Sequence, residues 1–122
     1  DVTGFALLGH AWEVARASRV TVEIDSAAVP LIPGARRLAA EGLLTSGDKT
    51  NRLYVGDDIE LGENVGPELA SLLFDPQTAG GLLISIAEER AHELVARLRA
   101  TYPDACVIGR VRERGARSIV VR

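Results

Sequence analysis

The chain of 122 residues is poor in cysteine and histidine and contains no methionine. Its single cysteine, Cys106, excludes an intrachain disulfide, and the two histidines, His10 and His92, leave too few soft ligands for a zinc site. This sparse cysteine usage fits a reducing, cytoplasmic setting best. Because the sequence has no methionine and opens directly on a motif at Asp1, we expect it to be a piece of a longer polypeptide.

The sequence also lacks long apolar runs and any excess of basic residues. No stretch approaches the roughly 20 apolar residues that a membrane helix needs, and no basic-then-apolar segment heads the chain. With 17 acidic and 14 basic residues the formal net charge is -3, which gives no general attraction to nucleic acid or to an anionic membrane. We therefore expect neither of them as a partner.

What is present is the composition of one ordinary globular domain. The chain is 47% hydrophobic and 25% charged, within the usual range for globular proteins. A chain of this length buries roughly two-thirds of the surface that its unfolded form exposes. We therefore expect residues 1–122 to fold as a single domain around a core of their own.

Apolar residues at helical spacing predict four helices. The first covers residues 3–17, and the last covers residues 88–100. Between them, Pro33 opens a short helix that Gly42 closes, and Pro67 opens another that ends before Pro76. The inward faces are expected to be Leu8, Ala11, Trp12 and Ala15 in the first helix and Ala91, Leu94, Val95 and Leu98 in the last.

Alternating and β-branched runs predict the strands. They cover residues 20–24, 82–86, 106–112 and 118–121, and the turn-like residues 113–116 make the last two an antiparallel hairpin. The glycine-rich stretch 45–66 is expected to be mostly a mobile loop with a weak strand at 53–55. The pattern predicts an α+β domain in which helices pack on a mainly antiparallel or mixed β-sheet.

The first candidate site is the entrance of the first helix. Asp1 and Thr3 precede the apolar run, so either side chain can serve simply as the helix cap. The same position suits a ligand, because free N–H groups at a helix start favour an anion and a carboxylate can hold a divalent cation bridging that anion. The local sequence leaves both interpretations open.

The second candidate site is the segment 75–81, which lies between a predicted helix and a predicted strand. Its two glycines let the backbone approach a ligand closely, since glycine has no Cβ, and successive N–H groups can form an anion-binding concavity. The alternative is a tight helix-to-strand turn. The residues of this segment with ligand-binding potential are Asp75, Gln77, Thr78, Gly80 and Gly81.

Other polar residues give weaker signals. Arginines at 110, 112 and 114 follow the two-residue period of a strand and are typical of a solvated sheet face. His10 has Glu13 one turn away, so we interpret it as a surface or packed histidine rather than a catalytic base. Cys106 lies in an apolar run and is expected to be a small buried residue. No residue of the chain is a candidate nucleophile.

Two motifs together resemble one enzyme family. Residues 1–10 (DVTGFALLGH) closely resemble the segment that opens the C-terminal domain of selenophosphate synthetase (selenide, water dikinase), and residues 75–81 (DPQTAGG) resemble that family's Asp-Pro-Gln-Thr-Ser-Gly-Gly. Residues 29–35, Asn51 and residues 108–111 match the family as well, so the resemblance spans the whole chain. The wider aminoimidazole ribonucleotide synthetase superfamily shares this architecture.

The resemblance implies a two-domain enzyme that converts selenide, ATP and water to selenophosphate, AMP and phosphate with Mg²⁺. In that family the nucleophilic cysteine or selenocysteine and most magnesium ligands belong to an N-terminal domain, so this piece is expected to be inactive alone. Asp1 matches the one family metal ligand in this region. Thr3, Gly4 and the segment 75–81 are expected at the ATP-binding junction with that domain, and the complete protein is expected to form a homodimer.

Two positions depart from the family pattern. Ala6 replaces the usual glycine and is expected to strengthen the helix by up to ~1 kcal/mol, while Ala79 replaces a serine and removes a hydroxyl. Two alternatives stay open: a stand-alone module that binds a nucleotide or a protein, and the same domain of another ATP-dependent enzyme of the superfamily.

Overall fold

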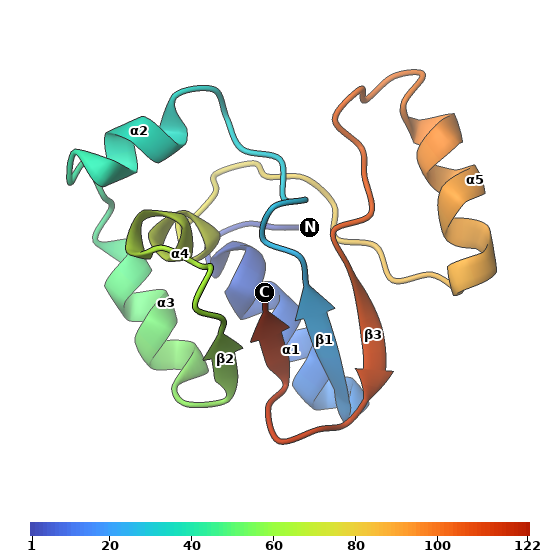
Figure 1. Cartoon of the computed structure of the whole chain (residues 1–122), viewed down its shortest axis with the longest axis horizontal. Helices are drawn as coiled ribbons and strands as arrows, with labels where there is room; N and C mark the ends of the chain where they lie inside the picture. The colour runs from blue at the N-terminus through green and yellow to red at the C-terminus, as the bar shows by residue number, and fades with distance from the viewer.

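The computed structural model describes all of residues 1–122 and contains a single sheet with helices around it (Figure 1). The elements occur in the order α1 (Ala6–Ser18), β1 (Val20–Ile24), α2 (Ala35–Ala40), α3 (Gly47–Val55), β2 (Ile59–Leu61), α4 (Pro67–Leu73), α5 (Glu88–Leu98), β3 (Gly109–Glu113) and β4 (Ile119–Val121). None of the helices has the length and apolar character that crossing a bilayer requires.

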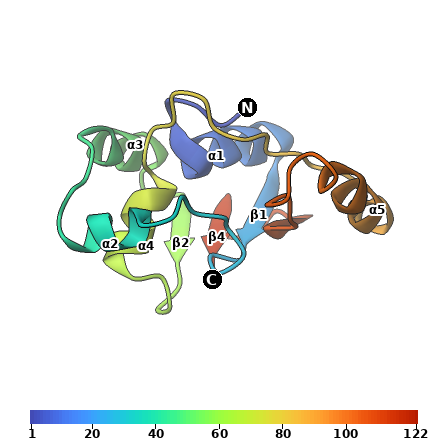
Figure 2. The same ribbon diagram turned by 90° about the horizontal axis from the view of Figure 1, so that it is seen from above.

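The sheet has the strand order β2-β4-β1-β3 and is mixed. Strand β1 runs antiparallel to β3 and parallel to β4, and β4 runs parallel to β2. Helix α1 lies over one face of this sheet (Figure 2). The α+β class with helices on a mixed sheet is therefore confirmed.

The predicted C-terminal hairpin is wrong, because β1 lies between β3 and β4. The side chain of Thr21, in β1, explains how the connection passes round the end of that strand. Its hydroxyl donates to the carbonyl oxygen of Arg117 at 2.6 Å and accepts from the N–H of Gly115 at 2.9 Å. Residues 114–117 are thus held against the end of β1 instead of folding β4 back onto β3.

The core forms between α1 and the sheet. All four predicted inward residues of α1 are buried, and they pack with Ile24, Ile119 and Val121 from the neighbouring strands β1 and β4. The register explains this arrangement, since Val22 pairs with Ile119 and Ile24 pairs with Val121, which places the apolar residues of both strands on the same face of the sheet.

The stretch 45–66 was predicted to be mostly loop, and this prediction is wrong. It contains helix α3 and strand β2, and the weak strand expected at 53–55 lies inside α3. The buried residues of α3 are Asp48, Asn51 and Val55, which recur at helical spacing. Because two of these three residues are polar, hydropathy alone could not reveal the buried face of this helix.

The helices after α1 agree with the sequence in part. Helix α4 begins at Pro67 as predicted, and Gly42 takes the left-handed conformation expected after α2, although α2 begins at Ala35 rather than at Pro33. Helix α5 is present, but its apolar side is only half-buried. The strand predicted at 82–86 is not formed.

Candidate functional site

The two sequence motifs lie side by side, although the residues that pair between them are more than 70 positions apart in the chain. The N–H of Val2 donates to the carbonyl oxygen of Gly81 at 2.9 Å, and the N–H of Gly80 donates to the carbonyl oxygen of Val2 at 3.1 Å. The N–H of Gln77 donates to the carbonyl oxygen of Thr3 at 3.0 Å. In both views the segment after α4 runs beside the start of the chain (Figures 1 and 2). The two candidate sites therefore lie next to each other in the fold.

This pairing depends on the absence of a side chain at Gly80. A Cβ at this position would lie 2.3 Å from the carbonyl oxygen of Val2, a distance that no real Cβ contact tolerates. A Cβ on the next residue, Gly81, would meet no atom within 4 Å. The first glycine is thus required for the close approach of the two backbones, whereas the second leaves open space at the surface.

Helix α3 supplies one side chain, Asn51, that hydrogen-bonds to the backbone at both motifs. Asn51 is 3% exposed, and its Nδ2 group donates to the carbonyl oxygens of Gly4 and Phe74, both at 3.0 Å. Both amide hydrogens are therefore used, one within the first motif and one on the residue that precedes the second motif. Family likeness is the one sequence signal for this residue, because the pattern of residues 45–66 predicts a loop rather than helix α3.

The side chains of the 75–81 loop divide into two groups. Asp75 accepts a hydrogen bond from the hydroxyl of Thr45 at 2.7 Å, and Gln77 donates from Nε2 to the carbonyl oxygen of Asp75 at 3.1 Å. These two side chains shape the loop. In contrast, Thr78, Gly80 and Gly81 are exposed and can meet a ligand.

Asp1 directly precedes the paired residue Val2, and its side chain is exposed. The chain gathers no group of three or more His, Cys, Asp or Glu side chains that could hold a metal ion. Mg²⁺ is commonly bound by one or two carboxylates together with waters and phosphate oxygens. The donor set of this chain therefore fits one contribution to a magnesium–phosphate site and does not fit a complete site.

The helix entrance does not use Asp1 or Thr3 as a side-chain cap. The residue before the first turn of α1 is Phe5, and no side chain caps the helix. The hydroxyl of Thr3 instead lies 3.1 Å from Nε2 of His10, one turn into α1. The capping interpretation is therefore wrong for both residues.

Ala6 corrects another expectation. Its φ angle is 62°, in the left-handed region, and its side chain is fully buried. A left-handed conformation costs a residue with a Cβ roughly 1–2 kcal/mol. Alanine here does not strengthen the helix, as expected from propensity, because this position has the backbone geometry that favours glycine.

Side-chain hydrogen bonds link Thr3 to residues of α1 and α3. His10 Nδ1 lies 3.1 Å from a carboxylate oxygen of Glu13, which confirms the predicted neighbour. The hydroxyl of Tyr54 donates to the other carboxylate oxygen of Glu13 at 3.0 Å. The ring of Phe5 stacks on Tyr54 at 4.6 Å and meets His10 edge-on at 5.5 Å.

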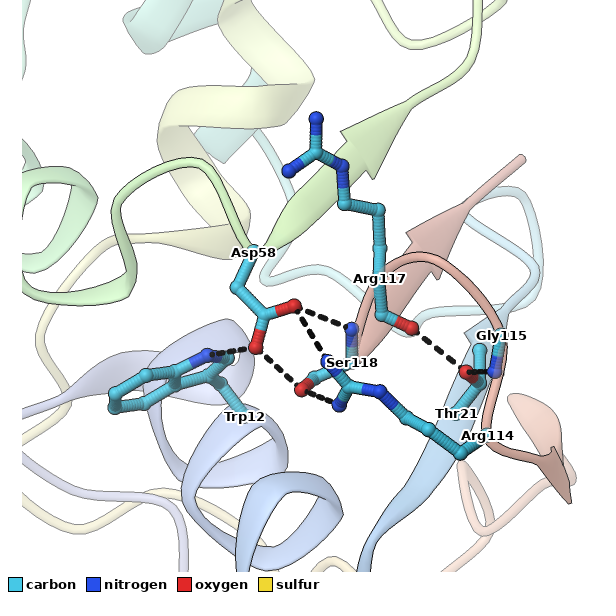
Figure 3. Close-up of polar contacts among 7 residues, drawn as sticks. All are labelled: Trp12, Thr21, Asp58, Arg114, Gly115, Arg117 and Ser118. Atoms are coloured by element: carbon cyan, nitrogen blue, oxygen red, sulfur yellow. Dashed lines mark hydrogen bonds and ion pairs between the residues drawn. The ribbon is translucent and has the colours of Figure 1, made fainter.

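A second polar cluster is centred on Asp58 (Figure 3), and no sequence pattern predicted it. Its carboxylate accepts from Trp12 Nε1 at 3.0 Å, from the N–H of Ser118 at 2.8 Å and from the hydroxyl of Ser118 at 2.5 Å, and it pairs with Arg114 at 3.0 Å. Burial raises the pKa of Asp58, but these hydrogen bonds and the arginine charge outweigh burial and hold the pKa below its usual value. The cluster joins α1 to the approaches of β2 and β4.

The arginines of β3 lie at a different place from the motifs. A hollow of about 410 Å³ is lined by Arg110, Arg112, Arg122 and Glu23, among others. Glu23 accepts from Arg112 at 2.5 Å and pairs with Arg122 at 3.6 Å, and the hydrogen bond from Arg112 lowers its pKa despite some burial. Two of these three arginines thus pair with Glu23, and the side chains of all three are exposed to solvent.

Comparison with known proteins assigns the fold to a family. The sequence profile described as "AIR synthase related protein, C-terminal domain" matches residues 1–122. The chain is 42% identical over its whole length to a selenide, water dikinase of Clostridium botulinum (strain Eklund 17B / Type B), of which it covers 35%. It is 47% identical to that of Caldanaerobacter subterraneus subsp. tengcongensis and 44% identical to that of Clostridioides difficile (strain 630), with 100% and 99% of this chain covered and 36% and 35% of those proteins. The chain thus spans about a third of the length of these curated relatives.

Proposed function

This chain belongs to the AIR synthase related protein C-terminal domain family, and we propose on that premise that it is the C-terminal domain of a selenophosphate synthetase. In this proposal, residues 1–122 form one domain of a two-domain enzyme that makes selenophosphate from selenide, ATP and water. The observation that carries the proposal is the pairing of Val2 with Gly80 and Gly81, which brings both motifs of the resemblance to one edge of the domain.

Asp1 is the residue that would hold Mg²⁺ in this enzyme. Its carboxylate is exposed beside the paired backbones and supplies one oxygen ligand of the kind that Mg²⁺ prefers. A magnesium ion held there would neutralise charge on the phosphates of ATP. The remaining magnesium ligands would come from the N-terminal domain, as the resemblance implies.

The other residues of the site have separate roles in the proposal. Thr3, Gly4, Thr78, Gly80 and Gly81 are close to the joined edge and would meet the nucleotide, since glycine lets the backbone approach phosphate oxygens closely. Asp75 and Gln77 would act indirectly, because Asp75 is anchored by Thr45 and Gln77 by the Asp75 carbonyl oxygen and both keep the loop in shape.

The chain alone would be inactive, because it offers a single carboxylate to the metal and no candidate nucleophile. Its first partner would be its own N-terminal domain, and the complete protein would form a homodimer in the cytoplasm. Neither nucleic acid nor a membrane is expected as a partner, given the net charge of -3.

Phosphorus NMR tests this proposal on the complete protein that contains this chain. With ATP, selenide and Mg²⁺ we expect resonances of selenophosphate, AMP and phosphate, and the 122-residue chain alone should produce none of them. Replacement of Asp1 by asparagine in the complete protein should lower turnover at least tenfold, whereas Asp104→Asn, at an exposed position away from the motifs, should leave it unchanged. Turnover of ATP without a selenium product would point to another enzyme of the superfamily.

Calorimetry distinguishes the remaining alternative, a stand-alone nucleotide-binding module. A preformed site on the 122-residue chain would bind Mg-ATP with micromolar affinity, about 8 kcal/mol of binding free energy. Half a site should give almost no heat. Tight binding by the chain alone would therefore overturn the proposed division of the site between two domains.

A further inference from the structure

Four side chains from three segments form a continuous hydrogen-bonded series at the motif edge. Thr3 Oγ1 lies 3.1 Å from His10 Nε2, and His10 Nδ1 lies 3.1 Å from Glu13 Oε2. The Tyr54 hydroxyl lies 3.0 Å from Glu13 Oε1. The series therefore runs from Thr3, through two residues of α1 that are one turn apart, to Tyr54 of α3.

The carboxylate of Glu13 sets the direction of two of these hydrogen bonds. An ionised carboxylate only accepts, so His10 donates to Glu13 from Nδ1, and Tyr54 donates to the second carboxylate oxygen. The hydrogen bond to Glu13 raises the pKa of Tyr54, which keeps the phenol protonated as a donor. When His10 is neutral and carries its proton on Nδ1, its Nε2 atom is an acceptor and receives the hydroxyl hydrogen of Thr3.

Aromatic rings hold this geometry in place. Phe5 stacks on Tyr54 with ring centroids 4.6 Å apart, and Trp12 meets Tyr54 edge-on at 5.1 Å. Phe5 also contacts the edge of His10. Such ring pairs restrict the rotamers of the side chains between them.

We propose that His10 and Glu13 are positioning residues that orient the hydroxyl of Thr3, so that its oxygen faces the ligand edge as a hydrogen-bond acceptor. This inference rests on the proposed function, because the ligand is the magnesium–ATP complex. Thr3 then receives a hydrogen bond from the ligand, for which metal-bound water or a ribose hydroxyl is the suitable chemical class. The backbone of Thr3 faces the same edge, since its carbonyl oxygen accepts from Gln77 N–H.

A double-mutant cycle on the complete protein tests whether His10 acts through Thr3. We expect Thr3→Val and His10→Ala each to raise KM for Mg-ATP about tenfold, with little change in kcat. The double variant should be no worse than Thr3→Val alone, because the hydroxyl that His10 orients is then absent. Additive effects would overturn the proposal.

Two conservative variants separate the two nitrogens of His10. The amide of His10→Gln reaches the position of Nε2 and can still accept from Thr3, so KM should return to within about threefold of the native value. The amide of His10→Asn reaches the position of Nδ1 and serves Glu13 only, so KM should remain raised. Equal KM values for the two variants would contradict the assignment, and His92→Ala, an exposed histidine on α5, is the control.

The tautomer gives a readout that does not depend on activity. Long-range ¹H–¹⁵N NMR spectra of the complete protein should show the His10 proton on Nδ1, and Thr3→Val should shift the Nε2 resonance. A proton found on Nε2 would overturn the inference even if selenophosphate is made. The opposite outcome separates the two proposals. If calorimetry shows that the effects of the Thr3 and His10 changes on Mg-ATP affinity are not additive, but no selenium product forms, then the inference stands and the proposed function is rejected.

Discussion

Helices α1 and α5 begin from similar sequence patterns and reach different surroundings. Both carry an apolar stripe at helical spacing, and the stripe of α1 is buried against β1 and β4. Helix α5 has no buried residue and lies beyond β3, away from the other helices (Figures 1 and 2). Periodicity therefore predicts that a helix forms, whereas packing partners distant in the chain decide what covers it.

The difference extends to the segments around the two helices. No residue from 75 to 117 is buried, while the rest of the chain contributes the whole core. The candidate site lies at the boundary between these regions, because the 75–81 loop is hydrogen-bonded to Val2, in the segment that precedes α1. The site thus combines an anchored side, supplied by α1 and α3, with an exposed side formed by the loop.

The strongest test of this comparison is a pair of leucine truncations. Leu8 of α1 is fully buried, so Leu8→Ala should lower the free energy of unfolding by about 2–5 kcal/mol through lost burial and the cavity left behind. Leu94 of α5 is only half-buried, and Leu94→Ala should cost about 1 kcal/mol or less. Urea denaturation of both variants measures this. Equal losses would show that α5 is as well anchored as α1.

The second test addresses the fastening of the loop with two adjacent glycines. Gly80→Ala places a Cβ against the carbonyl oxygen of Val2 and should cost about 1–3 kcal/mol, together with weaker Mg-ATP binding by the complete protein. Gly81→Ala meets no neighbour and should change stability by less than about 0.5 kcal/mol. If Gly80→Ala is as mild as its neighbour, then the two motifs are not in close contact.

The third test compares acidic residues of the two regions. Asp58→Ala removes the acceptor for Trp12 and Ser118, and leaving such donors without a partner should cost about 1–3 kcal/mol. Glu93→Ala on α5 breaks only an exposed pair with Arg97 at 3.8 Å, worth about 0.5 kcal/mol or less. Thermal unfolding of the two variants compares these costs, and Tm should fall more for Asp58→Ala. An equal shift in Tm would contradict the stabilising role assigned to the Asp58 cluster.

The pH dependence of stability gives the smallest expected effect. The pKa of Asp58 is lower in the folded chain than its usual value, so folding favours its ionised form. Its contribution is present above the unfolded pKa of about 3.9 and is lost as the pH falls through the folded pKa. Urea denaturation between pH 6 and pH 3 should therefore show a shallower fall for Asp58→Asn than for the native chain. Parallel curves would contradict this origin of the acid sensitivity.

The sequence could predict the elements that have a simple apolar pattern. The α1 stripe, β1 and the starts of α4 and α5 follow local rules of periodicity and punctuation, and the α+β class follows from them. Helix α3 was not predicted, because two polar residues, Asp48 and Asn51, occupy its buried face and break the apolar pattern. The sheet order of β3, β1 and β4 could not be predicted, because it depends on contacts between distant segments, such as those of Thr21 with the 114–117 connection.

The candidate site followed the same division. The motif residues could be chosen from their chemistry and from the family resemblance. The backbone hydrogen bonds that join the two motifs through Val2, Gly80 and Gly81 became visible only in the structure. Of the two interpretations of Thr3, only the helix cap is wrong, because its hydroxyl bonds His10 and not the helix entrance. The left-handed conformation of Ala6 likewise could not be read from helix propensity.

Hydrogen exchange on the complete protein, with and without Mg-ATP, tests the central claim most directly. The account predicts that nucleotide slows exchange in residues 1–10 and 75–81 together, since the two segments form one binding edge, and leaves α5 unchanged. Saturating Mg-ATP that slows exchange in α5, or in neither motif, would contradict it.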